Sequence, residues 1–190
     1  MLKKLPLSFY RRPDVVEIAK DLLGKIIITK FNGVTISGRI VETEAYNGIH
    51  DKASHAYGGR RTARTEVMYA GGGIAYVYLI YGLHHLFNVV TNVAGTPHAV
   101  LIRAISTSDN RMIIGPGKVS AHLGITVRHT GHSLISKDFY IADDGYIIQN
   151  SQIIAGSRIN IAYAMEDALL PYRFTYRNFE NGKPKRTTRG

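Results

Sequence analysis

The sequence predicts a single α+β domain, in which a curved, mainly antiparallel sheet shaped like an open barrel carries short helices and one protruding hairpin. Apolar runs of strand length are separated by tight-turn residues, and few segments carry the signals of a helix start. These runs do not alternate with helices, as they would in a parallel α/β fold. A chain of 190 residues with 45% hydrophobic residues can bury a core of its own.

The first predicted elements are a helix and a hairpin. Asp14 can cap a helix that follows Pro13, the segment VVEIAKDLL has its apolar residues on one face, and Gly24 ends it. The apolar run KIIITKF then predicts a buried strand. Asn32-Gly33 is a tight-turn signal that leads into the long strand VTISGRIVETEAY. We expect these two strands to pair antiparallel.

The remaining elements follow an irregular loop over residues 47–73, and loops of this length in compact domains are often functional. A second hairpin is predicted from IAYVYLI and LFNVVTNV, with its tip at YGLHH, and HAVLIRAI predicts another strand. GPGKVSAHLGI reads as a turn that leads into a short helix, and DFYIADD, GYIIQN and SRINIAYA are expected to be β-rich. We expect the domain to span residues 1–180 and the basic segment 181–190, which lacks apolar residues, to be a disordered tail.

The composition favours a phosphate-rich partner. Lys and Arg number 24 against 14 Asp and Glu, a formal charge of +10, and neutralising phosphates releases counterions. A basic protein that is merely soluble remains the alternative. No signal peptide and no run of about 20 apolar residues is present, so we expect a soluble, cytoplasmic protein with no membrane partner, nucleoid-associated if bacterial.

The sequence favours no metal and no cofactor. It contains no cysteine, and its close histidine pairs, His84 with His85 and His129 with His132, lack carboxylates at a familiar ligand spacing. No dinucleotide fingerprint and no nucleophile elbow occurs, and the Gly115–Lys118 turn is too short for a Walker A loop.

The strand VETEAY carries the first candidate chemistry. Alternate residues of a strand share a face, so Glu42, Glu44 and Tyr46 project to one side, with Val41, Thr43 and Ala45 on the other. If the valine face is the core, two carboxylates and a tyrosine line the opposite surface or a cleft. A solvated outer face is the alternative.

The loop and the second hairpin add basic and aromatic candidates. His55 could complete a pocket beside the carboxylates, or it could be an ordinary loop histidine. The arginines around Thr62 suit a phosphate clamp, because their forks match phosphate oxygens. Tyr81 at the predicted tip is either a wedge for opening DNA or a ring folded back on the sheet. Lys118, at the start of the short helix, gives a weak signal for a phosphate contact.

Together these segments resemble the alkyladenine (3-methyladenine) DNA glycosylase family. The matching segments occur in the family's order and cover most of residues 8–176; they are RIVETEAY, SHAYGGRRTART, AYVYLIYGLHHLFNVV, AVLIRA, GPGKVSAHLGI and INIAYAMEDALLPYRF. The sequence departs from the family's pattern at AISTSDNR after Arg103, at Ile114 and at Tyr172. The first two departures could alter the loops that support Arg103 and Lys118.

The resemblance implies a role for each matching residue. Glu44 matches the general base and Arg103 the arginine that holds the nucleophilic water. Tyr46, His55 and Tyr78 match the residues that sandwich and contact the flipped base, and Asn88 matches the asparagine that discourages normal guanine by crowding its exocyclic amino group. Tyr81 matches the residue that fills the gap left in the duplex. The segments that approach the DNA backbone contain Arg60, Thr62, Arg64 and Lys118.

The implied activity is that of a base-excision-repair hydrolase that needs no cofactor and acts as a monomer on double-stranded DNA. It would release alkylated or deaminated purines such as 3-methyladenine, 7-methylguanine, hypoxanthine and ethenoadenine. The catalytic strand positions hold no lysine, so we expect no Schiff base and no strand nicking. A non-catalytic nucleic-acid binder, or an RNA-binding module with a similar curved sheet, remains the alternative.

Overall fold

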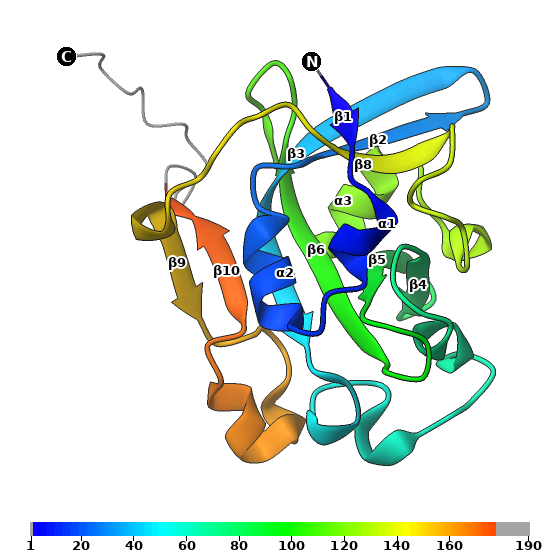
Figure 1. Ribbon diagram of the computed structural model, residues 1–190, viewed down its shortest axis with the longest axis vertical. Coiled ribbons are helices and arrows are strands. Elements are labelled where there is room, and N and C mark those ends of the chain that lie inside the picture. The colour runs from blue at the N-terminus through cyan, green and yellow to red at the C-terminus, as the bar shows by residue number, and fades with distance from the viewer. Residues whose placement is uncertain (1, 178–190) are drawn as a thin grey trace.

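The computed structural model describes residues 2–177, and it has the predicted α+β architecture (Figure 1). The strands are β1 (Lys3–Lys4), β2 (Ile26–Phe31), β3 (Val34–Tyr46), β4 (Ala75–Ile80), β5 (His84–Thr91), β6 (His98–Ser106), β7 (Met112–Ile114), β8 (Phe139–Asp143), β9 (Ile153–Gly156) and β10 (Arg173–Tyr176). The α-helices are α1 (Leu7–Tyr10), α2 (Val15–Asp21) and α3 (Pro116–His122). Short 3-10 helices lie in the connecting loops, and the longest of them covers Ala162–Leu169.

All of these strands belong to one curled antiparallel sheet. Its main path runs in the order β1-β8-β2-β3-β6-β5-β4, while β7 pairs with β6, and β10 joins β3 to β9. Strand β3 is the longest, and it bonds β2 with its first half, β10 with its second half and β6 along its other edge. Figure 1 shows α2 lying across β3 and β6, where it covers one face of the sheet.

The helix α2 and the first hairpin form as predicted. The Asp14 carboxylate accepts hydrogen bonds from the backbone N–H groups of Val16 and Glu17, which caps the first turn of α2. Asn32 and Gly33 both have positive φ, the backbone that a tight two-residue hairpin between β2 and β3 requires. Buried aliphatic residues of α2, α3 and the sheet then form the main core.

Two predicted β segments are not strands. Residues 145–150, GYIIQN, lie off the sheet because Asp143 and Asp144 accept hydrogen bonds from the backbone N–H groups of Gly145 and Tyr146, which turn the chain away. Residues 157–164, SRINIAYA, form bends and part of a 3-10 helix at Ala162–Leu169. The strand of this region is β9, which lies between them. The predicted tail, residues 181–190, is outside the described residues.

A paired irregularity interrupts the ladder between β3 and β6. Glu42 lies opposite Ala104, although Ile40 lies opposite Ile105 and Thr43 opposite Ile102. Val41 on β3 and Arg103 on β6 therefore have no partner in this ladder. Such bulges re-aim side chains.

The three residues predicted opposite the carboxylates are all buried. Thr43 and Ala45 face α2 and the main core, and Val41 packs in a smaller cluster with Ala104 and Tyr176. No helix within residues 2–177 has the length and apolar character needed to cross a membrane.

Candidate active site

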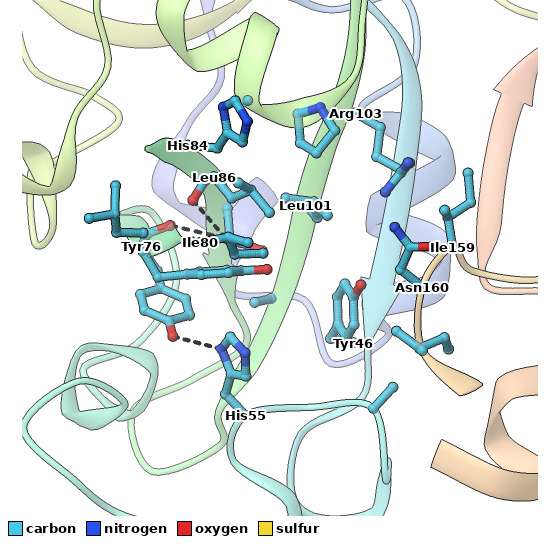
Figure 2. Close-up of a pocket in the computed structure, with 18 of the residues that line it drawn as sticks. Tyr46, His55, Tyr76, Ile80, His84, Leu86, Leu101, Arg103, Ile159 and Asn160 are labelled. Carbon is cyan, nitrogen blue, oxygen red and sulfur yellow. Dashed lines mark hydrogen bonds between the residues drawn. The ribbon is translucent and has the colours of Figure 1, made fainter. Parts of the chain in front are cut away.

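A cavity of about 450 Å³ opens between β3, β6, β5 and β4 and is closed at its sides by two loops (Figure 2). Small-molecule sites usually have volumes of this order. Tyr46 and Asn160 lie on one side of the cavity, and His55 and Tyr76 lie across from them. Arg103 reaches toward it from β6.

Glu44 lies directly behind the cavity wall. Its side chain has no solvent exposure, and it is not itself a lining residue. Its Oε1 accepts a hydrogen bond from the Ile159 backbone N–H at 2.8 Å, and its Oε2 accepts one from the Tyr46 hydroxyl at 2.8 Å. Arg103 Nη1 lies 3.4 Å from Oε2. Because Tyr46, Arg103 and Ile159 all line the cavity, they connect the carboxylate to it.

Arg103 bridges the two carboxylates that the strand pattern places on one face. Its Nε donates to Glu42 Oε1 at 3.2 Å while Nη1 faces Glu44, so one guanidinium serves both side chains. Glu42 also accepts a hydrogen bond from Arg173 Nη1 at 3.2 Å. The alternative of a solvated strand face is therefore wrong: both glutamates are buried and paired.

Burial sets the protonation behaviour of Glu44. Loss of water raises its pKa above the ordinary glutamate value, and the repulsion from Glu42 acts in the same direction. The charge of Arg103 and the hydrogen bonds from Ile159 and Tyr46 lower the pKa, but burial is the largest effect. A carboxylate with a raised pKa is a better proton acceptor, which suits a general base.

Aromatic rings form the walls of the cavity. His55 meets Tyr78 edge to face with ring centroids 4.6 Å apart, and Tyr76 lies beside Tyr78 at 5.5 Å. Tyr46 forms the opposite wall. The structure thus brings together Tyr46, His55 and Tyr78, as predicted.

His55 contacts two side chains beside the cavity. Arg64 Nη2 lies 2.6 Å from His55 Nε2 and 3.1 Å from Nδ1, and a guanidinium can only donate. His55 Nδ1 also lies 2.8 Å from the Tyr76 hydroxyl, to which it is hydrogen-bonded. Burial, together with the charges of Arg64 and Arg60, lowers the pKa of His55 to about 4. His55 is therefore neutral at physiological pH.

Asn88 and Tyr81 both belong to the second hairpin, Asn88 in its strand β5 and Tyr81 at its tip. Asn88 is buried on β5 and donates from Nδ2 to the backbone carbonyls of Tyr76 and Leu86, both at 3.2 Å. Tyr81 is 90% exposed at the hairpin tip, at a φ of 53°, and lies at the mouth of the cavity. It does not fold back on the sheet.

The four residues predicted near the DNA backbone, Arg60, Thr62, Arg64 and Lys118, are all exposed. Arg64 and Lys118 also line the cavity, Lys118 from the start of α3. Arg64 lies over the Tyr78 ring, 5.2 Å from its centroid, and is hydrogen-bonded to His55 and Tyr76. DNA backbone contacts for these four residues remain predictions.

Residues 8–180 match the family described as methylpurine-DNA glycosylase (MPG). A protein of Bacillus cereus (strain G9842) named "Putative 3-methyladenine DNA glycosylase" is 45% identical over 195 residues, which cover 90% of this chain and 95% of that protein. A protein of the same name from Bacillus anthracis (strain CDC 684 / NRRL 3495) is 45% identical over 194 residues, covering 90% of this chain and 94% of that protein.

The chain belongs to the methylpurine-DNA glycosylase family. It is a hydrolase of the DNA N-glycosylase class, and DNA is its substrate. Membership of an enzyme family confirms the resemblance found in the sequence, and it favours an enzyme over the alternative of a non-catalytic binder.

Several residues of the candidate site were not predicted. Ile159 and Asn160 reach the cavity from a segment that we expected to be a strand, where no periodic signal marks them. Arg158 forms a buried ion pair with Asp51 beside Tyr46. Tyr76 lies two residues before Tyr78 on β4 and shares its face, but its hydrogen bond to His55 depends on the loop geometry, which the sequence pattern does not give.

Proposed function

We propose that this glycosylase removes alkylated or deaminated purines from double-stranded DNA, with a water molecule activated by Glu44, and that it acts as a monomer. The observation that carries the proposal is the buried Glu44, whose three partners Tyr46, Arg103 and Ile159 all face an aromatic cavity. The base would leave the stack, since an N-glycosidic bond inside a duplex cannot be reached.

The walls of the cavity suit a damaged purine. Alkylation at a ring nitrogen leaves a positive charge on the base, and the faces of Tyr46 and Tyr78 attract a cation. Neutral hypoxanthine and ethenoadenine are flat and could stack on the same rings. The relatives' printed names point to 3-methyladenine, and 7-methylguanine has the same cationic character. Asn88 would crowd the exocyclic amino group of normal guanine from its buried place on β5.

The residues around Glu44 divide the chemistry. Cleavage develops positive charge on the sugar, which the carboxylate can stabilise while it accepts a proton from water. Arg103 would hold that water at Oε2 of Glu44, and Ile159 N–H would fix the carboxylate through Oε1. Neither β3 nor β6 places a lysine beside Glu44, which supports simple hydrolysis without a covalent enzyme–DNA intermediate.

One assay tests the reaction and its outcome together. The protein is incubated with duplexes that contain hypoxanthine or ethenoadenine, and each sample is divided before treatment with hot alkali. We expect cleavage at the lesion only in the alkali-treated half, because base removal leaves an alkali-labile abasic site. Cleavage without alkali, or a protein–DNA adduct trapped by borohydride, would contradict a monofunctional mechanism. Intact strands in both halves would contradict the proposed substrates.

Replacing Tyr81 with alanine tests the wedge. We expect hypoxanthine release from a duplex to slow by roughly tenfold or more, because a few kcal/mol of unstacking would no longer be offset. Release from single-stranded DNA should be nearly unchanged. The melting temperature should also be unchanged, since the ring is 90% exposed. An equal loss on both substrates would show that Tyr81 does not act through the duplex.

A further inference from the structure

Arg158 is a buried arginine that binds one carboxylate and two backbone carbonyl groups. Its Nη1 and Nη2 donate to the two carboxylate oxygens of Asp51 at 2.5 and 2.8 Å, and the side chains are 0% and 2% exposed. Nη1 also donates to the Ala45 carbonyl at 2.9 Å, and Nη2 donates to the Asp167 carbonyl at 3.1 Å. One guanidinium therefore ties the end of β3 to two loops.

Asp51 extends this junction on its own side. Its Oδ2 accepts a hydrogen bond from the Asn47 backbone N–H at 2.9 Å, and its Oδ1 accepts one from Ala53 N–H at 3.0 Å. Ala53 begins the stretch of loop that carries His55 into the cavity. The Arg158–Asp51 pair thus fixes the end of β3, the loop that leads to His55 and the backbone at Asp167 relative to one another.

The guanidinium also supports the wall of the pocket. It lies 5.0 Å from the ring centroid of Tyr46 and 5.2 Å from that of Tyr172. Tyr46 lines the cavity and Arg158 does not, so Arg158 covers the side of the ring that is turned away from the cavity. The next residue in the chain, Ile159, provides the N–H that holds Glu44 Oε1.

Stability alone does not account for this arrangement. A buried ion pair can often be replaced by apolar residues of similar volume without loss of stability. Arg158 Nε moreover has no hydrogen-bond partner among residues 2–177, a cost that an apolar side chain would avoid. The geometry is better explained by what the pair positions.

We propose that the Arg158–Asp51 pair positions the catalytic carboxylate, by holding Ile159 N–H on Glu44 and Tyr46 at the pocket wall. This inference rests on the proposed role of Glu44. Arg158 does not line the cavity and makes no hydrogen bond to Glu44 among the described contacts, although the two charges interact through space. Its positioning effect is therefore exerted through Ile159 and Tyr46. Lysine could keep the charge, but it could not keep a planar fork that reaches Asp51 and two carbonyls at once.

The electrostatic surroundings of Glu44 give the inference a specific signature. The groups that interact with Glu44 are Arg103 from β6, Glu42 and Tyr46 on β3, Tyr78 from β4, Tyr163 from the 162–169 helix and Arg158 itself. Arg173 from β10 bonds Glu42. Because removal of the Arg158 charge would by itself raise the pKa of Glu44, Arg158→Lys is needed beside Arg158→Met. The hydrogen bond from Ile159 lowers the pKa of Glu44. If the 157–160 segment loosens, that hydrogen bond weakens and the pKa of Glu44 rises. The rate falls at low pH as Glu44 becomes protonated, and this acidic limb of the pH–rate profile then moves to higher pH.

The experiment measures single-turnover release of hypoxanthine from one duplex, at saturating protein and across pH, for wild type, Arg158→Met and Arg158→Lys. We expect both variants to release the base up to about 10²-fold more slowly, as small displacements of catalytic groups can cost that much. We also expect the acidic limb to move to higher pH in both. Since every variant acts on the same duplex, protonation of the base contributes equally to each profile.

Arg39→Met is the matched control. Arg39 makes the same type of fork, to Asp144 at 3.2 and 2.6 Å, donates to the Gly24 carbonyl and lies 4.6 Å from the Tyr146 ring, but it does not line the cavity or hold any of its residues. It should keep the wild-type rate and profile. Melting temperatures of all variants show whether each one folds, and Arg158→Lys retains a charge for Asp51 if Arg158→Met does not fold.

Each outcome decides the inference. A shifted limb in both Arg158 variants supports it. A shift in Arg158→Met with a wild-type profile in Arg158→Lys would show that charge alone matters and would overturn it. Wild-type profiles in both variants would also overturn it. Glu44→Gln in the same series separates the two proposals: if that variant still releases the base, the proposed role of Glu44 is wrong, whatever Arg158 does.

Discussion

Replacing Glu44 with glutamine is expected to slow hypoxanthine release from a duplex by about 10²–10⁴-fold, the usual contribution of a general base. Glutamine keeps the shape of the side chain, but it cannot accept the proton of the attacking water. Because Glu44 has no solvent exposure, the surface that meets DNA is unchanged. Duplex binding, measured by fluorescence anisotropy, should therefore stay at the wild-type level while the single-turnover rate falls.

The pH dependence gives this prediction a second readout. The proposed mechanism needs the carboxylate form of Glu44, so the wild-type rate should fall as the pH drops through the pKa of Glu44, which burial places above the ordinary glutamate value. The free energy of unfolding depends on pH in the opposite direction to the rate. A carboxyl whose pKa is raised on folding stabilises the fold when protonated, and this contribution is lost as the pH rises through the folded pKa.

The glutamine variant loses the buried charge, which favours folding near pH 7, but its NH2 group cannot accept a hydrogen bond as one of the two Glu44 oxygens does. These effects oppose each other, so its melting temperature should stay near that of wild type. A lower melting temperature would instead attribute the lost activity to misfolding. Glu17→Gln, on the exposed face of α2, is the control and should keep the wild-type rate. Release at the wild-type rate by Glu44→Gln would remove Glu44 from the mechanism.

Replacing Arg103 with methionine is expected to slow base release by about 10²–10³-fold, the usual cost of losing one preorganised polar contact in an active site. The change removes the cation 3.4 Å from Glu44 Oε2, whose charge lowers the pKa of Glu44. Glu42 and Glu44 would then repel each other without the bridging charge. The acidic limb of the rate profile should move to higher pH.

Arg103→Lys separates charge from geometry. A lysine keeps the charge but cannot serve Glu42 and Glu44 with two groups held in one plane, so its rate should lie between those of wild type and Arg103→Met. Arg111→Met is the control, because Arg111 is exposed beyond the end of β6 and pairs loosely with Asp109 at 3.8 Å. It should be fully active. An unchanged pH limb in Arg103→Met would show that Arg103 does not tune Glu44.

The features that the sequence predicted well are those set by local chemistry. The Asp14 cap and the Asn32-Gly33 turn depend on residues close to one another in the chain, and both form as expected. The alternation of Glu42, Glu44 and Tyr46 placed them on one side of a strand. Which side was buried could not be deduced from that alternation, because the side chains of Arg103 and Arg173 cover it from distant parts of the chain.

The features that the sequence did not predict depend on contacts between distant segments. Asp51 and Arg158 are separated by more than a hundred positions, and each alone resembles an ordinary loop residue. The segment around Arg158 has a strand-like composition, yet its side-chain and backbone groups are used by Asp51 and Glu44 rather than by a neighbouring strand. Short strands such as β1 and β7 carry too few residues for any periodicity.

The paired bulge between β3 and β6 limits which single-residue deletions these two strands can tolerate. Val41 is one unpaired residue on β3 and Arg103 is one unpaired residue on β6, so the register is the same on both sides of the irregularity. Loss of a single codon from either strand would shift the pairing by one residue, and such a shift turns every later side chain to the opposite face. Lineages of this protein should therefore keep both codons, or gain and lose them together.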